Sequence, residues 1–257
     1  IVAPLKGIGS TPPYHHDKPV NLFRLIPPDR QFEKEWKKET IDESLHVVHN
    51  IWPQTWERGE PQSLFAASLE GVTMFSYKND KWESLNWAKG NPEPFPKSGA
   101  GEVKTGRLAD QPVPIVATIE PWHGNQAVVY VWTKFANNVV EGLERFVLDD
   151  GLAQGHAVWW SDFDRDGEDE LLIGFREKTP PKDLPGLNIY DLHLDPTSKQ
   201  KLTWEKYVVD DGGMATEDAL AADMNGDGWP DIVAYGRATH NIKYYENLGK
   251  GKNPKEK

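Results

Sequence analysis

Short stretches rich in β-branched and aromatic residues, some of them alternating with polar residues, recur along the 257-residue chain. Four of them follow one another with turn residues between them: HAVWWSDF (156–163), ELLIGF (170–175), LNIYDLHL (187–194) and TWEKYVVDD (203–211). Such stretches are typical of β-strands with one or both faces buried. Even the best helix candidate, RQFEKEWKKETIDESL (30–45), holds too few apolar residues at helical spacing. The chain is therefore predicted to be all-β.

The strands belong to a repeated unit. Residues 147–176 align without a gap with residues 208–237, at an offset of 61. Residues 40–69 form a third copy, and a partial match lays IVATIEPWHGN (115–125) over IVAYGRATHN (232–241). Tandem four-stranded antiparallel units of about 50 residues indicate a β-propeller. A repeat sandwich or an open β-solenoid is the structural alternative.

The spacing of the repeats predicts the domain organisation. We expect one propeller domain over residues 1–257, and the full protein to have seven blades, of which this chain supplies the C-terminal part. Missing N-terminal blades of the same protein are then the expected partner. The blades are predicted as a partial blade at 1–45, full blades at about 46–100, 101–152 and 153–213, a partial blade at 214–250, and a polar tail at 251–257.

An acidic loop with the pattern D-x-[DN]-x-D-G-x-x-[DE] follows the first strand in two of the repeats. Side-chain oxygens at this spacing suit Ca²⁺, which takes six to eight oxygen ligands. An EF-hand is excluded because Ile173 or Ala234 stands at the twelfth position, where an EF-hand has Glu, and because the flanks are strands. The alternative is a solvated acidic turn, but packed carboxylates repel one another unless a cation neutralises them. We therefore predict a structural Ca²⁺ in each loop, held by Asp162, Asp164, Asp166 and Glu170 and by Asp223, Asn225, Asp227 and Asp231.

A second set of polar residues falls at the opposite end of the predicted strands. Because the first strand of each blade lines the propeller channel, we expect these residues to converge at one mouth of a central funnel. For any single histidine a structural or surface role is the alternative. The set comprises His49, His156 and Glu217 at the start of a first strand, Glu120, Arg176 and Arg237 at the end of a second strand, and Trp122, His123 and His240 in the turns that follow.

These residue types suggest particular chemistry. Histidine can act as acid or base near neutral pH, and arginine can clamp a carboxylate or stabilise an enolate. Three or four neutral imidazoles can instead hold Zn²⁺ with an open coordination position. Tryptophan beside polar groups suits a sugar, and Glu120, Trp122 and Glu217 are the predicted substrate-binding residues.

Charge and composition exclude other classes. The chain has 29 basic and 40 acidic residues, a net charge of −11, and no basic run, so nucleic acid and anionic membrane are poor candidates as partners. No apolar stretch approaches membrane-spanning length. The absence of cysteine removes thiolate metal sites and cysteine nucleophiles. The chain begins without Met, and we expect the true N-terminus to lie upstream, so a targeting signal cannot be read from it. The compartment therefore stays undecided, with an extracellular location favoured.

Several motifs resemble a known family. DESLHVVHNIWP, EPWHGNQ, GHAVWWSDFDRDG and GRATHN are similar to the propeller domain of fungal aldos-2-ulose dehydratases and their bacterial VCBS (FG-GAP) repeat relatives. The resemblance implies a seven-bladed propeller whose central cleft carries Zn²⁺ and dehydrates a 2-ketosugar such as 1,5-anhydrofructose. The cupin domains of the dehydratases are not present in this chain. The chain also resembles propeller lyases that release a sugar next to glucuronate.

The predicted function is a carbon–oxygen lyase that acts on a carbohydrate by β-elimination. His49, His123 or His156 removes a proton next to a carbonyl or carboxylate, and these three are not distinguished by sequence. Arg176, Arg237 or a metal ion stabilises the enolate, and a second histidine, with His240 as a further candidate, returns a proton to the leaving oxygen. The alternatives are a glucuronate-type lyase on the same fold, a non-catalytic sugar-binding propeller and an interaction scaffold.

Overall fold

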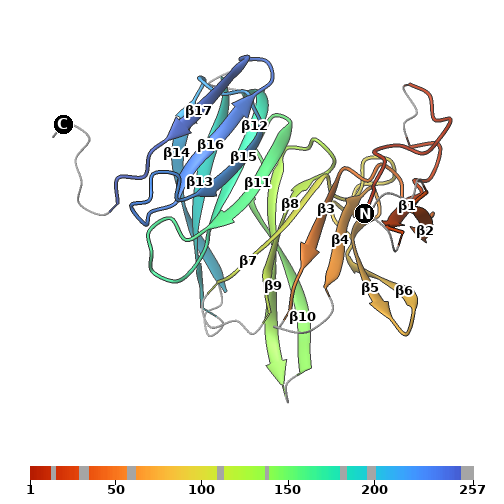
Figure 1. Cartoon of the computed structure of the whole chain (residues 1–257). Helices are drawn as coiled ribbons and strands as arrows, with labels where there is room; N and C mark the ends of the chain where they lie inside the picture. Colours follow the sequence, from red (N-terminus) through yellow and green to blue (C-terminus); the bar gives the residue numbers. More distant parts are fainter. Residues whose placement is uncertain are drawn as a thin grey trace. The chain divides into compact units, whose positions relative to one another are not determined.

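The computed structural model describes residues 1–12, 16–28, 35–56, 62–108, 113–136, 139–179, 184–195 and 201–249. In these ranges the regular secondary structure is β throughout, as predicted (Figure 1). No helix in them is long and apolar enough to cross a lipid bilayer. The chain forms two compact units, one made of Ile1–Val103 with Glu120–Trp122 and the other of Lys104–Ile119 with the described residues from His123 onward. The prediction of a single domain over 1–257 stays a prediction, and the tail at 251–257 lies outside the described residues.

The first unit contains a two-stranded and a four-stranded antiparallel sheet. β4 is buried along its whole length, which its run of small and apolar residues (SLFAAS) allows. Its core joins Val20 and Leu22 to Leu64, Ala66 and Phe75. The paired strands are β1 (Leu22–Ile26) with β2 (Lys37–Asp42), and, in spatial order, β3 (Asn50–Gln54), β4 (Ser63–Ser68), β5 (Gly71–Lys78) and β6 (Lys81–Ala88).

Apart from the ends of β7 and β8, the second unit contains three further antiparallel sheets (Figure 1). The first has the order β10-β9-β8-β7, with β7 (Glu102–Gly106), β8 (Ile115–Glu120), β9 (Gln126–Ala136) and β10 (Val139–Asp149). The second has the order β11-β12-β13-β14, with β11 (Gly155–Ser161), β12 (Glu170–Thr179), β13 (Leu184–Leu194) and β14 (Leu202–Asp211). The third has three strands, β15 (Thr216–Ala222), β16 (Asp231–Gly236) and β17 (Asn241–Tyr245). The four strands predicted between 156 and 211 are thereby confirmed.

Consecutive sheets of the second unit pack face to face. Trp160 belongs to the core between the β7–β10 and β11–β14 sheets, whereas Trp159 packs in the core between β11–β14 and β15–β17. This follows from the strand period of two, which sends neighbouring side chains to opposite faces. At Gly174 in β12 an added Cβ would lie 2.4 Å from Cγ2 of Thr216 in β15. Glycine is therefore needed where these two strands approach.

A repeated aspartate ties each sheet to the next. Asp149, at the end of β10, accepts hydrogen bonds from the Gly151 backbone N–H (2.8 Å), the Tyr190 hydroxyl (2.7 Å) and Lys206 Nζ (2.5 Å). Burial acts to raise the pKa of Asp149, but the hydrogen bonds from Lys206 and Tyr190 outweigh it, so the pKa is lowered overall.

Asp210, 61 residues further on, has an equivalent set of partners. It accepts from the Gly213 N–H (2.6 Å), the Tyr245 hydroxyl (2.7 Å) and Lys243 Nζ (2.6 Å). Burial opposes ionisation here too, but the bonds from Lys243 and Tyr245 lower the pKa of Asp210. The same anchoring contact therefore occurs in both repeats.

Candidate functional site

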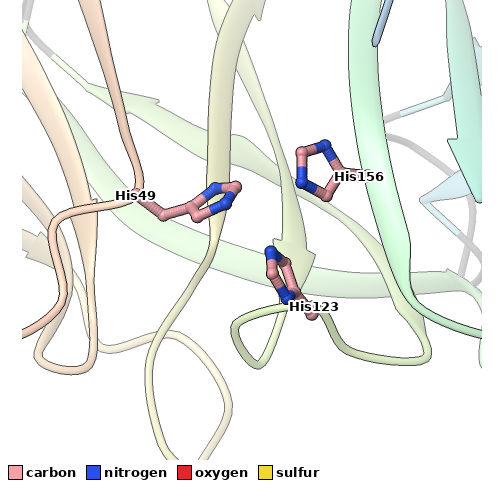
Figure 2. A group of neighbouring side chains, drawn as sticks. All are labelled: His49, His123 and His156. Atoms are coloured by element: carbon pink, nitrogen blue, oxygen red, sulfur yellow. The ribbon is translucent and has the colours of Figure 1, made fainter. Parts of the chain in front are cut away.

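His123 and His156 lie side by side in the second unit (Figure 2). His123 stands in the turn after β8 and His156 in β11, and their ring centroids are 4.9 Å apart with the planes tilted by 35°. The Gly155 N–H donates to the Gly124 carbonyl (2.8 Å), which fixes the turn against the strand. The structure therefore places these two predicted site residues beside each other.

Arg176 follows the last residue of β12 that pairs with β11. Its guanidinium connects the two histidines to other polar groups. Its Nη1 donates to both carboxylate oxygens of Glu217, at 3.0 and 3.3 Å. Its Nη2 donates to Oε1 of Gln154 at 2.6 Å and lies 3.3 Å from Nδ1 of His123. Arg176 is 8% exposed, so these contacts form in a largely desolvated environment, where charged hydrogen bonds are strong.

The hydrogen bonds assign opposite tautomers to the two histidines. Arginine can only donate, so Nδ1 of His123 is the acceptor and its neutral ring carries hydrogen on Nε2. Nδ1 of His156 lies 2.5 Å from the backbone carbonyl of Glu217, which can only accept. His156 therefore carries hydrogen on Nδ1 and a lone pair on Nε2. One ring of the pair is poised to give a proton and the other to take one.

A pocket of about 380 Å³ adjoins this network in the second unit. Arg176 and Gln154 line it together with Arg237 and His240. His240 and His123 both have a backbone φ of 50°, in the left-handed region that few non-glycine residues adopt. The two turns aligned by sequence therefore share a left-handed backbone at their histidine. The structure places Arg237 and His240 at this pocket and Glu217 in the network of Arg176.

The remaining predicted residues of this set belong to the first unit. His49 precedes β3 (Figure 2), and its Nδ1 lies 2.8 Å from Oε1 of Glu102 and 3.0 Å from the Gly101 carbonyl. The rings of His49 and Trp122 have centroids 6.0 Å apart. Glu120 is fully buried at the end of β8. That all of these residues share one funnel with the histidines of the second unit stays a prediction.

Two polar residues of these networks were missed by the sequence reasoning. Gln154 immediately precedes the Gly155–His156 step, and Glu102 follows Gly101. A sequence signal for Glu102 existed, because Gly101–Glu102 opens a first strand in the same way that Gly155–His156 does. Gln154 had no such signal, since only the fold brings it to the side chain of Arg176.

The first acidic loop, between β11 and β12, gathers its carboxylates. One oxygen from each of Asp162, Asp164, Asp166 and Glu170 lies within 4.8 Å of the others. Glu170 is buried and accepts a hydrogen bond from the Phe163 N–H (2.6 Å). Burial, aided by the nearby charge of Asp164, raises the pKa of Glu170 to about 8. These four residues could hold a hard cation through oxygen ligands.

The second loop, between β15 and β16, repeats the backbone pattern of the first. Asp223 accepts from the N–H groups of Asp227 (3.1 Å) and Gly228 (2.9 Å), as Asp162 does from Asp166 (3.0 Å) and Gly167 (3.1 Å). Asn225 and Asp227 are equivalent to Asp164 and Asp166, and Asp231 is equivalent to Glu170. Asp231 accepts hydrogen bonds from the N–H groups of Met224 (3.1 Å) and Asn247 (2.8 Å).

The two loops also contact each other. The Arg165 guanidinium of the first lies over the Trp229 ring of the second, 5.4 Å from its centroid. The side-chain amide of Asn247 donates to the carbonyl of Phe163 in the first loop (2.8 Å) and to that of Pro230 in the second (3.1 Å). The loops are thus fixed relative to one another by side chains and not only by their sheets.

Comparison with known proteins bears on the fold and on the chemistry. Residues 11–133 match the family described as the β-propeller domain of aldos-2-ulose dehydratase. The fold is a β-propeller. The predicted fold class, all-β with four-stranded antiparallel blades, is confirmed by this match and by the sheets; the number of seven blades stays a prediction.

The chain is also similar to one individual protein. The chain is 30% identical over 175 residues to aldos-2-ulose dehydratase of Phanerodontia chrysosporium, an alignment that covers 62% of this chain. The chain spans 19% of that relative's length. The predicted resemblance to the dehydratase propeller is confirmed at this level. Membership of the VCBS (FG-GAP) repeat family stays a prediction.

Proposed function

We propose that the protein is a carbon–oxygen lyase that dehydrates a 2-ketosugar, with the His123–His156 pair as its proton-transfer centre. The observation that carries this proposal is that Nδ1 of His123 faces a donor and Nδ1 of His156 faces an acceptor. The opposite tautomers that result are suited to a β-elimination, which needs one group that accepts a proton and one that donates it. The similarity to a dehydratase supports the choice of reaction. The residues to which we assign the steps of this reaction all belong to the second unit.

The proposed reaction begins with proton removal. Nε2 of His156 takes the proton from the carbon next to the ketone, and the electron pair of the C–H bond forms an enolate. The enolate then reforms the carbonyl as the C–O bond at the β-carbon breaks. Nε2 of His123 gives its proton to the departing hydroxyl, so water leaves and the sugar gains a carbon–carbon double bond. Proton exchange with solvent restores both rings, and acid–base help of this kind contributes roughly 10²–10⁴-fold.

The two arginines have different proposed roles. Both Nη atoms of Arg176 already donate to protein acceptors, so this side chain serves to position His123 and to hold its Nδ1 as an acceptor. Arg237 is exposed and lines the adjoining pocket with His240. We assign to Arg237 the stabilisation of the negative oxygen of the enolate.

The pair fits proton transfer better than it fits Zn²⁺. Nε2 of His156 has a lone pair and its Nδ1 donates to a carbonyl, the arrangement common in metal-binding histidines. His123 differs, because its Nε2 carries the hydrogen while Nδ1 faces Arg176. Binding of Zn²⁺ through Nε2 of His123 would place an N–H of the ring against an N–H of the guanidinium. No step of the proposed reaction is routed through a metal.

The test is an elimination assay with an aldos-2-ulose as substrate, in which the unsaturated product raises the absorbance in the near ultraviolet. We expect His156→Ala and His123→Ala each to lower kcat by at least about 100-fold, with the thermal unfolding unchanged. His193→Ala is the matched control, because His193 lies elsewhere, exposed on β13. Full activity in either of the first two variants would contradict the proposal.

A glucuronate-type lyase is a second candidate, favoured by one observation. Arg237 and His240 line the same pocket as Arg176, and cationic groups beside a proton-transfer pair suit a substrate carboxylate. A substrate with a glucuronate unit should then be cleaved faster than the neutral ketosugar, and Arg237→Gln should remove that preference.

We further propose that the first acidic loop, and by repetition the second, binds Ca²⁺ in a structural role. Four carboxylates gathered within 4.8 Å repel one another, and a divalent cation would relieve this repulsion at the connection of β11 and β12. Neither loop provides a residue to the histidine network, so the ion is assigned to stability and not to the reaction.

The outer face of the last sheet supports the proposal that a further blade packs on this chain. Ile242 of β17 pairs with Tyr235, at the position where Leu187 of β13 pairs with Gly174 one repeat earlier. Leu187 is fully buried against the β15–β17 sheet, whereas Ile242 is 76% exposed. A sheet of the same repeat type would cover Ile242 as β15–β17 covers Leu187.

A further inference from the structure

A histidine–carboxylate contact with little exposure to solvent lies in the first unit. Nδ1 of His49 is 2.8 Å from Oε1 of Glu102, and the two side chains are 11% and 8% exposed. The His49 backbone N–H donates to the Ala67 carbonyl (3.1 Å), which fixes the residue just before β3. The contact is thus built from ordered backbone on both sides, since Glu102 is the first residue of β7.

The partners of His49 determine which of its nitrogens holds the proton. A carboxylate and the Gly101 carbonyl (3.0 Å) both lie against Nδ1, and each can only accept from a neutral ring. Nδ1 therefore carries the hydrogen and Nε2 the lone pair. When Nε2 takes up a proton, the ring becomes a cation beside the anionic carboxylate of Glu102, which stabilises it.

A related contact occurs in the second unit, in a different electrostatic setting. His156 also reaches a glutamate at the start of the next first strand, Glu217, but through the backbone carbonyl. The carboxylate of Glu217 is paired with Arg176, and its Oε1 lies 3.8 Å from Nε2 of His156. Glu102 is therefore suited to support a cationic imidazole in a way that Glu217 is not.

We propose that Glu102 is the positioning residue of His49, fixing its Nδ1–H tautomer and making Nε2 a carboxylate-supported proton acceptor. The part of this inference that concerns catalysis rests on the proposed lyase function; the tautomer does not. Glu102 acts through His49 and is not itself assigned any contact with the substrate. His49 is thereby a second candidate, besides His156, for the base that removes the proton next to the ketone.

The first experiment measures the tautomer and needs no activity. Nitrogen-15 chemical shifts of the His49 ring, in protein labelled at histidine and assigned with His49→Gln, should show a protonated Nδ1 and an unprotonated Nε2 near pH 8. A ring with the hydrogen on Nε2 would overturn the proposal, whether or not the protein is a lyase.

The second experiment uses the elimination assay. Glu102→Gln keeps an acceptor for Nδ1–H but removes the charge, and we expect it to lower kcat by at least about 10-fold with little change in KM. The same change made in His49→Gln should have no added effect, because Glu102 acts only through His49. Additive losses in the double variant would indicate a merely structural role and overturn the positioning role.

Glu70→Gln is the matched control. Glu70 pairs with His46 at the same distance of 2.8 Å in the same unit, with both side chains more exposed. This variant should retain full activity. If no variant and not even the parent protein eliminates water from any ketosugar, the proposed function fails, while the ring spectra still decide the placement of the His49 proton.

Discussion

Replacing Asp149 by alanine tests the anchoring of one sheet to the next. Asp149 accepts three hydrogen bonds, from a backbone N–H, from Lys206 and from the hydroxyl of Tyr190. Tyr190 is fully buried between two sheets. The substitution therefore removes a charged acceptor in the protein interior and leaves the Tyr190 hydroxyl with only its side-chain hydrogen bond to Asn188.

The expected cost follows from these contacts. A hydrogen bond from Tyr190 to a charged acceptor is worth about 1.5–3 kcal/mol, and a buried donor left unsatisfied costs about 1–3 kcal/mol. Lys206 is too exposed to add much. Since these terms overlap, we expect Asp149→Ala to lower the free energy of unfolding by about 3–4 kcal/mol. Asp210→Ala should cost about half as much, because the equivalent Tyr245 is only partly buried and water can reach its hydroxyl.

Urea unfolding followed by tryptophan fluorescence measures both values. Tyr190→Phe supplies a further control: it should destabilise the parent protein by about 1–2 kcal/mol but have no cost, or a small gain, in Asp149→Ala. The reasoning is refuted if Tyr190→Phe costs the same in both backgrounds, or if Asp149→Ala is no more harmful than Asp210→Ala.

Three further predictions concern acid, cations and the outer face. Because the pKa of Asp149 is lowered in the folded state, its contribution should be complete above the ordinary carboxyl pKa of about 3.9 and be lost as the pH falls through the lower folded value. The unfolding free energies of parent and Asp149→Ala should therefore approach each other as the pH falls below about 3.9. Ca²⁺ at about 100 times its Kd should stabilise the parent by about 2.7 kcal/mol for each loop it occupies. A calorimetric scan should find this effect weakened in Asp166→Asn but retained in the control Glu168→Gln. Ile242→Lys should change stability by less than about 0.5 kcal/mol, whereas Leu187→Lys, at the covered equivalent position, should prevent folding as judged by circular dichroism.

The local pattern of the chain was sufficient for much of the fold. The strands around the first acidic loop, the loop itself and the opposite orientations of Trp159 and Trp160 follow from period-two alternation and from turn residues. The offset of 61 also anticipated that Asp149 and Asp210 stand at equivalent places, although not that each would accept a hydrogen bond from a tyrosine of the following sheet.

The proximity of His123 and His156 was predictable from the sequence, but the positions of the hydrogens on their rings were not. Placing His123 near His156 required only the repeat and the order of strands. Their tautomers depend on whether Nδ1 meets a donor or an acceptor, which is a matter of tertiary contact. For the same reason the sequence left Arg176 as one of three candidates to stabilise the enolate, whereas the contacts of its Nη atoms favour a positioning role.

The bridge made by Asn247 has a consequence for metal titrations. Its amide joins carbonyls that are far apart in sequence, one in each acidic turn, so order gained in one turn is transmitted to its neighbour. If both turns bind Ca²⁺, the first ion would already order part of the other turn. The second ion would then bind with a smaller loss of conformational entropy, and the binding isotherm would be sigmoidal. Asn247→Ala would then restore independent, hyperbolic binding without removing a single ligand.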